Sequence, residues 1–196
     1  MKAGDWTSAS GFDRDLKMNG VDRWRAIYRV THPQLAALRL LRRAETARAG
    51  KGIVSRLAYF LFRFAYARRS LALCIDIPLG VCAPGLSIAH VGSIVINGDA
   101  RVGPDCRIHQ GVTIGATRQG SPSIGTGVFI GPNAVILGRI QIGDNSVIGA
   151  GAIVTTDLPE GSRVLAVAPR LVAEGRAGWT SAGSGLGPDL ALDGDG

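Results

Sequence analysis

Residues 124–154 read IGTGVFIGPNAVILGRIQIGDNSVIGAGAIV, and in this stretch an aliphatic residue returns every six positions. A second series with the same step runs through residues 90–114. The two series comprise Ile124, Ile130, Ile136, Ile142, Ile148 and Val154, and His90, Ile96, Val102, Ile108 and Ile114. Ten of these eleven positions are Ile or Val, although these two residue types make up only 31 of the 196 residues. A period of six predicts a β-solenoid, in which short repeats stack on one another.

Two further columns accompany the aliphatic one. The position after it holds glycine at Gly103, Gly115, Gly125, Gly131, Gly143 and Gly149. The position four after it is small or aliphatic at Ala100, Cys106, Val112, Ala134, Ser146 and Ala152. Each six is therefore predicted to form one short strand and one tight turn, with glycine relieving the turn. A composition of 46% apolar but only 6% aromatic residues fits a slim aliphatic core.

A different pattern precedes the repeats. From Val21 to Ser70, arginines alternate with apolar residues at helical spacing, which predicts two or three amphipathic helices. In the last of them, Leu57, Phe60, Leu61 and Phe64 form one stripe, within an apolar run too short and too interrupted to span a bilayer. We expect these helices to pack on their own domain or on a partner subunit. Weak association with an anionic membrane surface stays open, whereas the lack of a groove-reading motif argues against nucleic acid.

These patterns divide the chain into four parts. We expect a disordered start at 1–20, an α-helical region at 21–74, the solenoid domain at 75–172 and a disordered tail at 173–196. The net charge of +7 suits a polyanionic partner. The polar start has no signal-peptide pattern, and the three cysteines, Cys74, Cys82 and Cys106, are odd in number and lack metal-ligand spacing. A cytoplasmic protein without a metal is therefore expected.

Four segments carry a family resemblance: IDIPLG (75–80), PGLSIAHVGSIVING (84–98), CRIHQGVTIG (106–115) and IGAGAIVTTDLP (148–159). They resemble the hexapeptide-repeat acetyltransferases of the serine acetyltransferase type, including the related O-acetyltransferases of bacterial polysaccharide loci. The resemblance implies a mainly β fold, a three-sided left-handed parallel β-helix of about four to five coils. It also implies acetyl-CoA as cosubstrate and a homotrimer or dimer of trimers.

His90 is the first candidate catalytic residue, because it interrupts the aliphatic column and matches the position of the family's base. An imidazole that titrates near pH 6.5 suits removal of a proton from an acceptor hydroxyl. The resemblance implies that Asp76 orients His90, although the spacing between them is one residue shorter than the family pattern. His109 is the alternative base, and we favour His90.

The resemblance also implies a binding site for acetyl-CoA. Gly149, Ala150 and Gly151 match the segment that holds its pantetheine arm, and Arg170 matches a basic residue near its phosphates. Arg139 is a further candidate for those phosphates, as is Arg163. The sequence AVAPRLV around Arg170 departs from the family pattern GVPARIV.

The step from Ile114 to Ile124 is ten residues instead of six, which predicts an extruded loop that carries the candidate substrate residues Arg118 and Gln119. The loop lacks the Arg-His pair of true serine acetyltransferases, and Ala89 stands before His90 in place of their aspartate. The acceptor is therefore left open between L-serine, for cysteine biosynthesis, and a sugar hydroxyl of a surface polysaccharide.

Three alternatives compete with this function. An acyl-cysteine route has no base adjacent to any of the three cysteines. A metal-dependent enzyme of the γ-carbonic anhydrase kind needs three converging histidines, and the chain has only His32, His90 and His109. A non-catalytic scaffold associated with a membrane through the basic helices is the third alternative.

Overall fold

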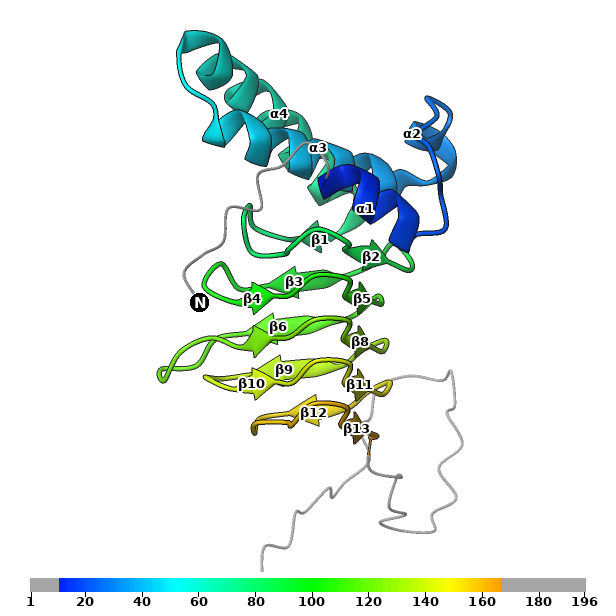
Figure 1. The fold of residues 1–196 in the computed structure, drawn as a ribbon, viewed down its shortest axis with the longest axis vertical. Helices are drawn as coiled ribbons and strands as arrows, with labels where there is room; N and C mark the ends of the chain where they lie inside the picture. The colour runs from blue at the N-terminus through cyan, green and yellow to red at the C-terminus, as the bar shows by residue number, and fades with distance from the viewer. Residues whose placement is uncertain (1–10, 167–196) are drawn as a thin grey trace, which may run out of the picture.

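The computed structural model describes residues 11–166, which form a stack of β-coils with helices packed at one end (Figure 1). The helices are α1 (Gly11–Met18), α2 (Tyr28–Thr31), α3 (Pro33–Ala49) and α4 (Ile53–Leu73). Pro33 is the first residue of α3, a position whose N–H has no partner within the helix, so proline loses no hydrogen bond there. Helix α4 is capped by Cys74 in a left-handed conformation. The predicted helical region and β-solenoid are both present.

The strands of the solenoid are short and all their pairings are parallel. They are β1 (Ile75–Asp76), β2 (Ser87–Ile88), β3 (Ile94–Ile96), β4 (Arg101–Val102), β5 (Arg107–Ile108), β6 (Thr113–Gly115), β7 (Ser123–Ile124), β8 (Phe129–Ile130), β9 (Val135–Leu137), β10 (Gln141–Ile142), β11 (Val147–Ile148), β12 (Ile153–Val154) and β13 (Arg163–Val164). They form three sheets, which we name faces A, B and C. Face A has the order β1-β3-β6-β9-β12, face B has β4-β7-β10, and face C has β2-β5-β8-β11-β13.

The chain visits the faces in the order A, B, C, so that three strands make one coil and about five coils make the stack. The register places the aliphatic column in line, as in the pairs Ile114 with Ile136 and Ile130 with Ile148. Isoleucines of this column are almost fully buried in one continuous core. The predicted stacking of aliphatic side chains from coil to coil is therefore confirmed.

Glycine is required where successive turns touch. A Cβ atom at Gly103 would lie 2.3 Å from the carbonyl oxygen of Gly125 in the next coil. Backbone at that distance leaves no room for any side chain, so a glycine column is the condition for stacking the turns this closely.

The first coil corrects the predicted register. Ile88 pairs with Ile108 and occupies the aliphatic position, whereas His90 follows two residues later and is exposed. The chain takes eight positions from Ile88 to Ile96, where the next coil takes six from Ile108 to Ile114. The expectation that His90 interrupts the aliphatic column is wrong: His90 lies on a two-residue insertion at the corner between faces C and A.

The helical end also differs from expectation, because α1 lies within the segment 1–20 that we expected to be disordered. Leu16 of α1 is buried in the core and Asn19 donates to the Leu86 carbonyl at 3.1 Å, which ties α1 to the first coil. The expected tail at 173–196, and the part of the expected solenoid domain beyond residue 166, lie outside the described residues.

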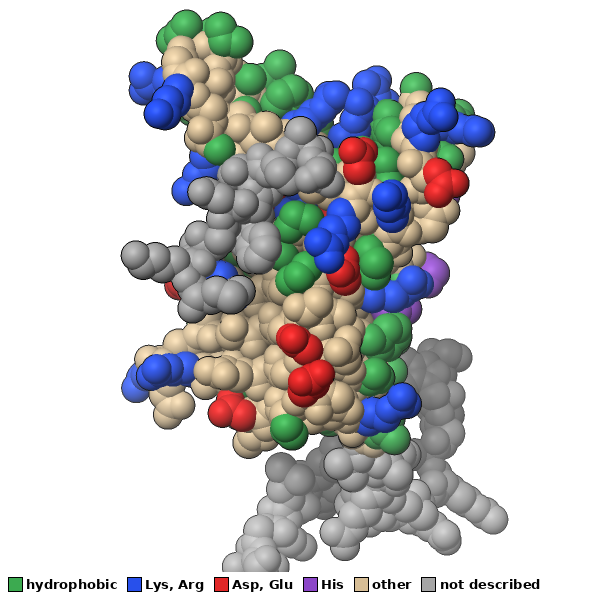
Figure 2. Space-filling model, in the orientation of Figure 1, with side chains coloured by type: hydrophobic (Ala, Val, Ile, Leu, Met, Phe, Trp, Pro, Cys, Tyr) green, Lys and Arg blue, Asp and Glu red, His purple; other side chains and the backbone are tan. Residues whose placement is uncertain are grey.

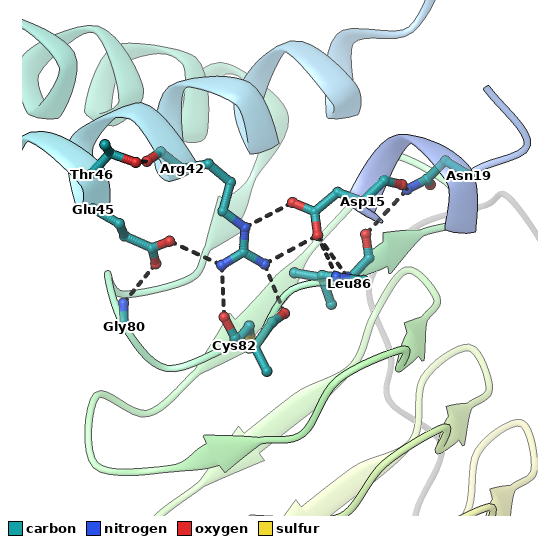
Figure 3. Close-up of polar contacts among 10 residues, drawn as sticks. Asp15, Asn19, Arg42, Glu45, Thr46, Gly80, Cys82 and Leu86 are labelled. Atoms are coloured by element: carbon teal, nitrogen blue, oxygen red, sulfur yellow. Dashed lines mark hydrogen bonds and ion pairs between the residues drawn. The ribbon is translucent and has the colours of Figure 1, made fainter. Parts of the chain in front are cut away.

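A buried ion-pair network joins the helices to the first coil (Figure 3). The Arg42 guanidinium donates to the carboxylates of Asp15 and Glu45 at 2.8 and 2.9 Å, and to the carbonyls of Cys82 and Ala83 at 2.8 Å. Burial raises the pKa of the Asp15 carboxyl, and the charge of Arg42 opposes that shift. Two helices and one loop of the solenoid therefore share a single fully bonded guanidinium.

Candidate active site

Two histidines lie one above the other on the corner between faces C and A. His90 follows β2 and His109 follows β5, and these strands are paired, so the two ring centroids lie 6.0 Å apart. Phe129 in β8 lies next to His109 in the following coil, with 5.0 Å between the two ring centroids. Histidine side chains gather on this edge of the solenoid, just below the helical end (Figure 2).

The two imidazoles have different surroundings. His109 is partly buried, and burial together with the charges of Arg107 and His90 lowers the pKa of His109. Arg107 also donates to Nε2 of His109 at 3.4 Å, which requires an unprotonated nitrogen there. His90 is exposed, and no hydrogen bond reaches its ring from any residue between 11 and 166. Of the two rings, His90 is the one free to accept a proton from a ligand.

Asp76 lies away from this ring. It stands in β1 on face A, pairs in register with Val95, and lines a cavity of about 620 Å³ with Tyr66 and Ser93. Within the described part of the chain no hydrogen bond joins Asp76 to His90. The first coil takes six positions from Asp76 to Cys82, where the next takes seven from Val95 to Val102, so the first coil is one residue shorter at the corner between faces A and B.

Gln110 is a polar residue to which the sequence assigned no role. Its side-chain oxygen is buried without a hydrogen-bond partner among the described residues. Gly92, beside His90, lies against it: a Cβ atom at Gly92, whose φ is 151°, would come within 2.8 Å of Cβ of Gln110. The corner therefore holds a basic ring and an unused amide acceptor on adjacent coils. The spacing of polar residues alone could not reveal this pairing, because it depends on the insertion before Gly92.

The segment Gly149, Ala150 and Gly151 forms the turn between β11 and β12, on the same corner as His90 but three coils further along. Ala150 and Gly151 are exposed, and the Gly151 N–H donates to the Pro132 carbonyl at 2.8 Å. This turn thus exposes its backbone on the same corner as the imidazoles. Arg170 lies outside the described residues.

The candidate substrate loop lies on a different corner, between faces A and B. Thr117 and Gly120 exchange backbone hydrogen bonds of 2.9 and 3.2 Å, which leaves Arg118 and Gln119 exposed at the tip. Gly120 contacts the stem of Arg139 from the next coil, since a Cβ atom there would lie 3.3 Å from Cβ of Arg139. The loop that carries Arg118 and Gln119 therefore lies on the same corner as Arg139. Within one chain, face A separates this corner from His90.

The buried thiols are poor nucleophiles. Burial raises the pKa of the Cys106 thiol to about 11 and raises that of Cys82 as well. Cys74 is exposed at the end of α4, and neither candidate base lies beside it in the chain. An acyl-cysteine intermediate therefore finds no activated thiol among them. His32 belongs to the helical end, where its ring lies 4.9 Å from that of Tyr28, so three histidines do not converge.

Coils of six-residue repeats with parallel faces define the chain as a hexapeptide-repeat β-solenoid. In agreement with this, residues 121–156 match the sequence profile described as Bacterial transferase hexapeptide (six repeats).

The known proteins similar to this chain include serine acetyltransferases. The chain is 40% identical over 92 residues to a serine acetyltransferase of Synechococcus elongatus, an overlap of 45% of this chain and 38% of the relative. It is 36% identical over 96 residues to a serine acetyltransferase of Helicobacter pylori, an overlap of 47% of this chain and 56% of the relative. The chain thus spans between about two fifths and just over half of these curated relatives.

A solved structure extends the likeness to the helical end. The serine acetyltransferase of Neisseria gonorrhoeae, crystallised in complex with serine, superposes with a TM-score of 0.62 at 31% identity over 81% of this chain and 66% of that chain. The predicted resemblance to hexapeptide-repeat acetyltransferases of the serine acetyltransferase type is confirmed.

Proposed function

We propose that this chain is an acetyl-CoA-dependent O-acetyltransferase that transfers acetyl to the hydroxyl of L-serine. The observation that carries the proposal is the joint likeness of repeats, coils and helical end to serine acetyltransferases, one of them crystallised with serine. The three free thiols suit a reducing compartment such as the cytoplasm.

In the proposed reaction His90 is the general base. The acceptor oxygen attacks the thioester carbonyl carbon while its proton passes to the imidazole of His90. The tetrahedral intermediate, stabilised by a backbone N–H, collapses with cleavage of the carbon–sulfur bond. The imidazolium then returns the proton to the departing thiolate, which gives the acetyl ester and CoA. This role is supported by an exposed imidazole that has no hydrogen bond to any residue from 11 to 166.

Two further residues have proposed roles, Asp76 toward the base and Gln110 toward the acceptor. Asp76 is the candidate orienter of His90, which requires its carboxylate to move toward the corner between faces C and A when the ligands bind. The side-chain oxygen of Gln110, buried and without a partner among the described residues, would accept a hydrogen bond from the acceptor amine or hydroxyl once the side chain turns outward.

The separation of the two candidate corners supports an assembly of several copies. His90 and the turn at Gly149–Gly151 lie on one corner, whereas Arg118 and Arg139 lie on another. A neighbouring copy in a homotrimer would bring its second corner against the first, with acetyl-CoA in the groove between them. The backbone of Gly149–Gly151 then holds the pantetheine arm, and Arg139 or Arg170 meets the phosphates.

The base is tested by His90→Ala, measured as release of CoA thiol with L-serine as acceptor. We expect kcat to fall by about 10²- to 10⁴-fold while acetyl-CoA still binds. His109→Ala is the matched control from the neighbouring coil and should retain most activity. Equal losses in both variants, or an unchanged rate in His90→Ala, would refute the assignment of His90.

A sugar hydroxyl is the second candidate acceptor, because the loop at 116–122 lacks the Arg-His pair expected for serine binding. A panel of L-serine and sugar acceptors, compared by kcat/KM, distinguishes the two. A chain that neither binds acetyl-CoA nor releases CoA with any acceptor would instead be a non-catalytic scaffold.

A further inference from the structure

The helical end carries far more positive charge than the rest of the chain. Residues 21–74 contain twelve Lys and Arg but only two acidic residues, Asp22 and Glu45, whereas the whole chain has a net charge of +7. Glu45 is already paired with Arg42 inside the protein. Among the described residues, every helix is too short or too polar to cross a bilayer. The charge therefore belongs to the surface of the helices.

Five of these arginines surround one pocket between α2, α3 and α4, with a volume of about 480 Å³. They are Arg29, Arg39, Arg43, Arg68 and Arg69, with Trp24 and small apolar residues completing the wall. Among residues 11–166, no carboxylate lines the pocket and none forms an ion pair with any of the five arginines. Five guanidinium groups at one cavity, with no counter-charge from the described residues, favour the binding of an anion there.

The hydrogen bonding of the pocket is also incomplete. Arg69 donates from Nη2 to the Arg29 carbonyl, but its Nε is buried without a partner among the described residues. Arg39 lies over the ring of Trp24, with 4.5 Å from its Cζ to the ring centroid. Burial and the charges of Arg43 and Arg29 lower the pKa of Arg39. An oxyanion in the pocket would supply the missing acceptor and relieve the repulsion.

An exposed apolar stripe on α4 adjoins this pocket. Leu57, Phe60, Leu61 and Phe64 follow one another at helical spacing, Leu71 extends the line, and each is 64% to 80% exposed. Arg68 lies one turn beyond Phe64 and lines the pocket, so the stripe and the anion site share a border. Hydrophobic and basic side chains crowd this end of the molecule (Figure 2).

We propose that the helical end binds the surface of an anionic phospholipid membrane, with the arginine pocket receiving a lipid phosphate and the α4 stripe entering the headgroup boundary. A helix with an apolar face and basic flanks lies in the plane of a membrane in this manner. The negative surface potential of anionic lipids attracts each nearby Lys or Arg. Charge complementarity selects this occupant over a second copy, because an identical face would oppose the five pocket arginines with five more.

The experiment is co-sedimentation of the full chain with vesicles of phosphatidylcholine alone or mixed with phosphatidylglycerol. We expect binding to the mixed vesicles only, and loss of that binding at about 1 M salt, where the Debye length is about 3 Å. Arg39→Gln/Arg68→Gln should weaken binding roughly 25-fold, about 5-fold for each arginine removed. Phe60→Ser/Phe64→Ser should weaken it roughly 10-fold or more.

The matched control is Arg101→Gln/Arg163→Gln, which removes the same charge from exposed positions of the solenoid and should change binding less than about 2-fold. Equal weakening by the control and pocket variants would overturn the proposal, as would equal binding to neutral vesicles. Stabilisation by pyrophosphate that depends on Arg39 and Arg68, without vesicle binding, would identify a soluble phosphate compound instead. Self-association that Phe60→Ser/Phe64→Ser abolishes, again without vesicle binding, would identify a second copy.

Discussion

The solenoid and the helical end use the same aliphatic and aromatic residue types in opposite ways. In the coils, Ile108, Ile114 and Ile130 are completely buried, while on α4 Phe60 and Phe64 keep about two thirds of their surface in solvent. Residues 11–166 therefore bury the core of the coils but leave this face of α4 exposed. Stacked repeats cover one another's apolar side chains, whereas the terminal amphipathic helix has no repeat beyond it to do so.

The junction between the two regions should be the most sensitive point. Arg42→Ala leaves the buried carboxylates of Asp15 and Glu45 without their shared partner, which should lower the free energy of unfolding by about 3–5 kcal/mol. Urea unfolding followed by circular dichroism measures the loss. Arg48→Ala, an exposed position of the same helix, should stay within about 0.5 kcal/mol of the parent. Similar losses in the two variants would mean that the network does not hold the regions together.

The contrast in burial predicts that truncating an apolar side chain costs more stability in the solenoid than on the exposed face of α4. Ile130→Ala removes a fully buried side chain of the stack and should cost about 2–5 kcal/mol. Leu61→Ala on the exposed stripe should cost less than about 0.5 kcal/mol in the absence of membranes. Urea unfolding of both variants in dilute solution makes the comparison. A large loss in Leu61→Ala would show that the α4 face is already covered in solution.

The smallest expected effect is a dependence on pH from His109. Its folded pKa lies below the usual 6.5, so between the two values the unfolded chain binds a proton that the folded chain does not. The free energy of unfolding should therefore fall as the pH drops below about 6.5 toward the folded pKa, with no contribution from this group above about 6.5. Urea unfolding above and below that pH gives the slope. His109→Gln should reduce it, and an identical slope in this variant would contradict the assignment.

The sequence predicted the coils well because their cause is local. A six-residue period fixes which side chains face inward, and one glycine in each turn permits the stacking, so faces and core follow directly. The register failed at His90 because a step of six taken backward from Ile96 crosses the two-residue insertion between Ile88 and Ile96. Ile88, which holds the aliphatic position, lies two residues earlier, and the polar His90 in the column fits a functional substitution as well as it fits a change of register.

The site was only partly predictable for a related reason. The sequence pointed to His90, to the Gly149–Gly151 turn and to the loop with Arg118, but their distribution over two corners follows from the pairing of strands far apart in the chain. The role of Arg42 was hidden because it is one of twelve basic residues in a helical region. Its partner Asp15 lies in a polar segment that gave no signal of burial.

The spacing of the coils makes the solenoid a ruler. His90 and the Gly149–Gly151 turn lie on the same edge three coils apart, and neighbouring strands are roughly 4.8 Å apart, so the two marks stand roughly 14 Å from each other along the stack. A ligand that touches both must be extended and of about that length. Adding or removing one complete coil between them would change the distance from His90 to the Gly149–Gly151 turn by roughly 4.8 Å without altering either end.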